Sequence, residues 1–150
     1  MKRAQRLDTF RARLDETERD CAARLRAAET RVGDALSRLE DLVRYREEYL
    51  RDFARRSAAG IGAAALRDYQ AFVARLAEAI AQQHRQVGRC EVERDFERTR
   101  WREAAVQVKA VATVVERWRD EERAAAERAE QREMDERARE IASRPRELTI

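Results

Sequence analysis

Apolar side chains recur along the chain in alternating steps of three and four residues, separated by polar ones. The first series comprises Leu7, Phe10, Leu14, Thr17, Cys21, Leu25, Ala28, Val32, Ala35, Leu39 and Leu42. The second comprises Leu66, Tyr69, Val73, Leu76, Ile80, Gln83, Val87, Cys90, Arg94, Glu97, Trp101, Ala104, Val108, Val111, Val115 and Trp118, and within it the charged residues Arg94 and Glu97 interrupt the apolar stripe. Such spacing places each series on one narrow stripe of an α-helix, which is typical of a coiled coil.

The two series are separated by the segment Ser57–Ala63, which holds Gly60 and Gly62. Glycine adopts turn conformations that other residues disfavour, so the chain is expected to fold back here. We therefore predict an all-α fold, a long antiparallel two-helix coiled-coil hairpin. The expected parts of this single domain, 1–150, are a helix over 3–56, a turn over 57–62, a helix over 63–142 and a frayed tail over 143–150.

Folding back at the glycines also predicts a register. Val32 is expected near Val87, and Leu14 near Val108. Because the second helix is longer than the first, residues 120–145 should form a helical C-terminal overhang without a partner.

Two pairs of small residues carry further expectations. Gly33 falls opposite Gly88, which suggests that the helices approach closely or bend together at that level. Cys21 and Cys90 stand about ten residues out of register, or roughly 15 Å at 1.5 Å per residue, so no disulfide is expected.

Charge is abundant but mixed. Charged residues make up 42% of the sequence and aromatic residues 6%, and the formal net charge is only +3. Acids precede arginines by four residues, a spacing that favours ion pairs on a helix surface. These pairs are Asp15/Arg19, Asp20/Arg24, Asp34/Arg38, Glu40/Arg44, Glu47/Arg51, Asp52/Arg56 and Glu133/Arg137. An interleaved surface lacks the basic face of a nucleic-acid binder, so nucleic acid is not expected as a partner.

The first thirteen residues are the exception to this balance. They set five cations, Lys2, Arg3, Arg6, Arg11 and Arg13, against one acid, Asp8. We interpret the segment as an electropositive tip, and a fraying terminus is the plainer alternative.

Enzyme chemistry is not expected. The sequence has no phosphate-binding glycine loop, no HExxH motif and no nucleophile with a histidine partner, and we expect no cofactor, metal or small-molecule substrate. His84, the only histidine, is expected to be an exposed surface residue. No apolar run approaches the ~20 residues of a membrane span and no signal peptide is evident, so we expect a cytoplasmic protein.

A second apolar row accompanies the seam of the second helix. It consists of Phe72, Leu76, Ala79 and Gln83. A single partner helix cannot cover two rows fully, so Phe72 should remain partly exposed and mark a contact surface. The alternative is that Phe72 packs at the end of the hairpin against Phe53 or Tyr49.

Several segments resemble the FliJ family of flagellar type III export proteins in their order and spacing. They are Tyr45-Arg46-Glu47-Glu48-Tyr49, Tyr69-Gln70-Ala71-Phe72, Leu76-Ala77-Glu78-Ala79-Ile80, Trp101-Arg102-Glu103 and Met134-Asp135-Glu136. The resemblance implies a stalk-like hairpin at the centre of the hexameric export ATPase. Further implied partners are the ATPase's stator or regulator protein, the cytoplasmic domain of the membrane export gate, and export chaperones.

The resemblance also implies site residues. The family's gate-binding row corresponds to Phe72, Leu76, Ala79 and Gln83, where some members have histidine in the last position. The stalk end is expected to meet the ATPase through its charges. Its candidate contacts are Arg3, Arg6, Arg11, Arg13, Arg132 and Met134. A peripheral position at the cytoplasmic face of the inner membrane follows, and the isolated chain is expected to be a monomer.

Two other interpretations fit the same pattern. The equivalent stalk of a virulence type III secretion system would have the same physics and different partners. A structural coiled coil that dimerises through continuous parallel helices would have no fold at Gly60–Gly62.

Overall fold

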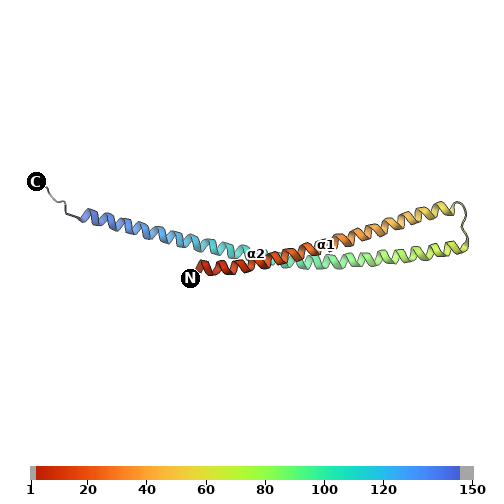
Figure 1. The fold of residues 1–150 in the computed structure, drawn as a ribbon, viewed down its shortest axis with the longest axis horizontal. Helices are drawn as coiled ribbons and strands as arrows, with labels where there is room; N and C mark the ends of the chain where they lie inside the picture. The colour runs from red at the N-terminus through yellow and green to blue at the C-terminus, as the bar shows by residue number, and fades with distance from the viewer. Residues whose placement is uncertain (1–2, 146–150) are drawn as a thin grey trace. The chain divides into compact units, whose positions relative to one another are not determined.

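The computed structural model describes residues 3–145, and these form two helices joined by a short turn (Figure 1). α1 spans Arg3–Ser57 and α2 spans Ala63–Ser143. The two helices pack against each other in opposite directions, so the predicted all-α antiparallel hairpin is confirmed. Because α1 ends at Ser57, continuous parallel helices are the wrong description of this chain.

The turn depends on one glycine conformation. Gly60 has a φ of 94°, a left-handed value that side chains with a Cβ disfavour. The amide of Gly60 donates to the carbonyl of Ser57 at 3.1 Å, and the amide of Leu66 donates to the carbonyl of Gly62 at 3.1 Å. These bonds end the first helix and begin the second.

Contacts divide the chain, predicted as a single domain, into two compact units. We call residues 17–104 the hairpin unit, and residues 1–16 with 105–150 the terminal unit. α1 and α2 each contribute to both units.

The core of the hairpin unit is a thin seam between the two helices. Val32 and Ala35 of α1 form one buried cluster with Val87 and Cys90 of α2, and Leu39 packs against it. The expected neighbours Val32 and Val87 thus lie together. Cys21 and Cys90 are both buried and both free, so they serve as small apolar residues of the seam.

The close approach of the helices expected at Gly33 and Gly88 does not occur. Gly33 and Gly88 are exposed, and a Cβ added to either would meet no atom within 4 Å. Each glycine follows a buried valine, Val32 or Val87, by one residue. One residue is about 100° of helical rotation, so both glycines face away from the seam and the helices gain no close approach there.

In the terminal unit, the first turns of α1 lie beside residues 115–119 of α2. Val115 is fully buried, Asp8 forms an ion pair with Arg119, and the guanidinium of Arg3 lies 4.9 Å from the ring centre of Trp118. From residue 123 to 145 every described side chain of α2 is exposed. This stretch is the predicted helical overhang.

Surface ion pairs form at a different spacing from the predicted one. Within residues 3–145 the helix-surface pairs at one-turn spacing are all i,i+3, and none of the expected i,i+4 pairs forms. In each of them an aspartate precedes an arginine by three residues: Asp41/Arg44, Asp52/Arg55, Asp95/Arg98 and Asp120/Arg123. The short aspartate side chain meets the long arginine one turn on. Exposed pairs of this kind contribute little to stability.

Candidate functional site

An aromatic cluster lies next to the turn of the hairpin unit. It draws Tyr45, Tyr49 and Phe53 from α1, at spacings of four residues that place them on one side of the helix. α2 supplies Tyr69 and Phe72, three residues apart. Tyr49 and Tyr69 stack with their ring centres 5.6 Å apart, and the Phe53 and Tyr69 rings also stack.

Phe72 occupies one edge of this cluster. Its ring centre lies 4.3 Å from that of Tyr49 and 6.0 Å from that of Tyr45, the latter in an edge-to-face arrangement. The contact with Tyr49 is one that the alternative interpretation foresaw. Phe72 is nevertheless only half-buried, and its neighbour Tyr45 is 49% exposed. The two rings therefore present aromatic surface beside the seam.

The rest of the predicted row leads from this surface into the seam. Leu76 is buried at 7% exposure, while Ala79 is half-buried. The side-chain amide of Gln83 donates to the main-chain carbonyl of Ala35 at 2.9 Å. The four residues lie along α2. Phe72 and Ala79 are partly exposed, whereas Leu76 is part of the buried core.

The residues predicted to contact the ATPase occupy two stretches of the terminal unit. Arg3 covers the ring of Trp118, Arg11 is half-buried, and Arg6 and Arg13 are exposed. Arg132 and Met134 lie in the exposed overhang. The structure thus places Arg3 and Arg11 beside α2, leaves Arg6 and Arg13 at the surface of α1, and leaves Arg132 and Met134 on the overhang.

A family model described as "Flagellar FliJ protein" matches residues 2–147. The chain belongs to the FliJ family. The match extends over both units, and the suspected resemblance is therefore confirmed. No curated protein and no solved structure matches the chain significantly.

FliJ membership makes this a flagellar export-related protein, and it favours the flagellar interpretation over the virulence one. Within residues 3–145, no helix is long and apolar enough to cross a membrane. The same residues contain no group of three or more histidine, cysteine, aspartate or glutamate side chains that could hold a metal ion. His84 is exposed, as expected.

Sequence reasoning missed the polar contacts that cross the seam of this FliJ chain. The indole nitrogen of Trp101, expected in the core, donates to a carboxylate oxygen of Glu18 at 2.8 Å. A tryptophan on a buried stripe needs an acceptor for its N–H, and Glu18 lies at the matching level of the predicted register. A tryptophan on the stripe and a glutamate opposite it in the register could therefore have predicted this hydrogen bond.

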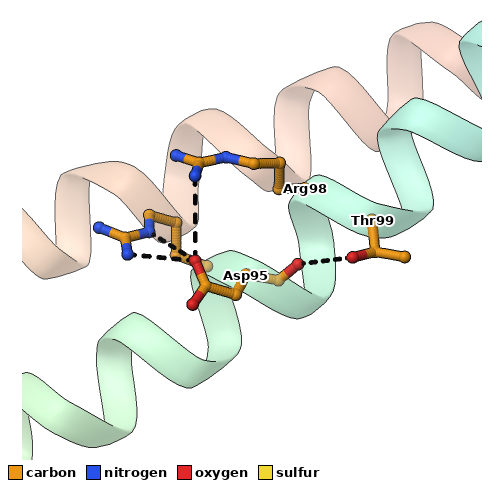
Figure 2. A network of polar contacts seen from close by, with 4 residues as sticks. Asp95, Arg98 and Thr99 are labelled. Carbon is orange, nitrogen blue, oxygen red and sulfur yellow. Dashed lines mark hydrogen bonds and ion pairs between the residues drawn. The ribbon is translucent and has the colours of Figure 1, made fainter.

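Arg94 and Glu97, which interrupt the apolar stripe, are accommodated differently. Arg94 turns to the neighbouring Asp95, with two nitrogen–oxygen distances of 3.1 Å, and Arg98 reaches the same carboxylate at 4.0 Å (Figure 2). The main-chain carbonyl of Asp95 accepts a hydrogen bond from Thr99 (Figure 2). One carboxylate oxygen of Glu97, by contrast, is buried without a hydrogen-bond partner.

Proposed function

We propose that this FliJ-family chain is a stalk-like coiled coil that links the flagellar export ATPase ring to the membrane export gate. In this proposal the hairpin unit contacts the cytoplasmic domain of the gate. The terminal unit contacts the ATPase, and export chaperones and the ATPase's stator protein bind the same hairpin. The protein acts in the cytoplasm, at the inner face of the membrane.

The observation that carries the gate contact is the partial exposure of Phe72. Aromatic side chains at the edge of a well-packed cluster are rigid, and they lose little conformational freedom on binding. Phe72 is held by Tyr45 and Tyr49 at the ring distances given above. Ala79 offers a small neighbouring surface two turns along α2.

The terminal unit supports the ATPase contact through charge. Arg6 and Arg13 are exposed at its start, and the overhang alternates acidic and basic residues over 123–145 without burying any of them. An isolated helix of this kind is marginal in water, so docking on a partner would stabilise it. Because α2 contributes to both units, partners on the two units would be joined by one continuous helix.

The direct test is the affinity of the purified chain for the cytoplasmic domain of the export gate. Phe72→Ala should weaken binding about tenfold or more, as expected for loss of a partly buried aromatic anchor. Phe96→Ala is the matched control, because Phe96 lies on the same helix and is 59% exposed. Circular dichroism should give equal helicity for both variants. If Phe72→Ala binds the gate domain as tightly as the wild type does, the proposed gate contact at Phe72 is wrong.

A further inference from the structure

A second exposed apolar row runs along α1 in the hairpin unit. It consists of Leu36, Val43 and Leu50, of which the two leucines are 41% and 40% exposed and Val43 is half-buried. Residues seven apart lie on the same side of a helix, so the three side chains form one line beside the seam. Neither of the apolar series in the sequence includes these residues. We call them the α1 row.

The α1 row lies on a different side of the hairpin from the proposed gate surface. Tyr45, which contacts Phe72, follows Val43 by two residues. Two residues correspond to about 200° of rotation on an α-helix, so Val43 and Tyr45 emerge on opposite sides of α1. A partner on the α1 row would therefore leave Phe72 accessible.

The α1 row has an acidic edge. Glu40 and Glu47 follow Leu36 and Val43 by four residues, a spacing that makes each glutamate a neighbour of the apolar side chain one turn before it. Both glutamates are exposed. The row is thus flanked by two carboxylates on the solvent side.

These carboxylates have no ion-pair partner among residues 3–145. Arg44, four residues after Glu40, lies instead 3.7 Å from Asp41. Arg51, four residues after Glu47, donates from Nε to the main-chain carbonyl of Glu47 at 3.4 Å. Neither arginine forms an ion pair with its glutamate, so the carboxylates of Glu40 and Glu47 are available to a cation of a partner.

We infer that the α1 row docks an amphipathic helix of another protein, one that carries lysines or arginines along the edge of its apolar stripe. A partner helix that lies along the α1 row covers the leucines of the row. The lysines or arginines of the partner then lie near Glu40 and Glu47. The inference does not depend on the proposed gate or ATPase contacts.

The charge and the exposed area of the α1 row favour a cationic helix over a membrane surface and over a second copy of the chain. Anionic lipid cannot form ion pairs with the carboxylates of Glu40 and Glu47, which favours a cationic partner over a membrane surface. A second copy of the chain would need about 800 Å² of each partner for a standard interface, and two leucines near 40% exposure with one half-buried valine fall short of that. A single helix needs less.

The test uses the full chain and two synthetic helical peptides that share a leucine stripe. One peptide has lysines along the edge of the stripe and the other has glutamates at the same positions. Fluorescence anisotropy below the peptides' self-association concentration should detect the lysine peptide only. Leu36→Gln with Leu50→Gln should weaken its binding about tenfold or more. Glu40→Gln with Glu47→Gln should weaken it about two- to fivefold.

Each variant has a matched control in the hairpin unit. Val92→Gln with Phe96→Gln removes two more exposed apolar residues, and Asp34→Asn with Glu48→Gln removes the same charge from other faces of α1. Both should bind the lysine peptide as wild type does. Equal binding of the glutamate peptide, or unchanged binding by the leucine variant, would overturn the inference. So would loss of binding in Phe72→Ala, or light scattering showing that the leucine variant converts a dimer into a monomer.

Discussion

The indole N–H of Trp101 donates to the carboxylate of Glu18 at 2.8 Å, joining residues 83 positions apart in the sequence. This hydrogen bond fixes the alignment of α1 on α2 within the hairpin unit. The amide of Gln83, bonded to the carbonyl of Ala35, fixes the same register nearer the turn. If either helix slipped along the other, both hydrogen bonds would break and their donors would lose their acceptors. The two bonds therefore favour one register more strongly than apolar contacts alone would.

Glu18→Ala should lower the free energy of unfolding by about 1–2 kcal/mol, because a half-buried indole N–H loses a charged acceptor. Urea unfolding followed by circular dichroism measures this change. Glu29→Ala is the control, since Glu29 is exposed on the same helix and the substitution alters helix propensity equally. Equal stability of the two variants would mean that the Trp101 bond does not form in solution.

Val115→Ala should destabilise the terminal unit by about 2 kcal/mol, because Val115 is fully buried there and its loss leaves a cavity. Val106→Ala, nine residues earlier on α2 and 67% exposed, should change stability by less than about 0.5 kcal/mol. Amide exchange over residues 5–14 of α1 gives the measurement, with faster exchange expected only in the first variant. Indistinguishable exchange would contradict the packing of α1 on Val115.

Glu97→Leu should stabilise the hairpin unit by roughly 1 kcal/mol. The substitution removes a buried carboxylate oxygen that lacks a partner and extends the apolar stripe. Thermal unfolding should show a higher midpoint temperature. A lower midpoint would reveal that Glu97 makes a stabilising contact in solution.

Removal of residues 120–150 should reduce stimulation of the export ATPase while leaving binding to the gate domain unchanged. The truncation takes away the exposed overhang but retains Arg119 and its ion pair with Asp8. ATP hydrolysis by the purified ATPase, titrated with the full and truncated chains, measures the effect. Undiminished stimulation would exclude the overhang, including Arg132 and Met134, from the ATPase contact.

Much of the fold could be predicted because each stripe repeats one simple rule. The three-and-four spacing gave the buried positions such as Val32 and Val87, and Gly60 marked the turn. The same spacing could not fix where long polar side chains go. Arg44 pairs with Asp41 and not with Glu40, and Asp52 pairs with Arg55 and not with Arg56. In each case both spacings lie within reach of a flexible guanidinium, so the sequence alone could not tell which pair forms.

The candidate site was predictable only in outline. Spacing and resemblance placed Phe72 on a second row, but its packing on Tyr45 and Tyr49 depends on rings from both helices. Leu76 belongs both to the seam series of the second helix and to the Phe72 row. Spacing alone could not predict that its side chain is buried in the core. The assignment of these residues to the export gate remains a prediction.

The most direct test is the distance between spin labels on exposed positions 12 and 109 of the terminal unit, in a background with Cys21→Ala and Cys90→Ala. These positions neighbour the expected pair Leu14 and Val108. A chain that folds back at Gly60 predicts a short, narrow distance distribution that persists when labelled protein is diluted with unlabelled protein. A long distance, or a short one that disappears on dilution, would contradict the hairpin.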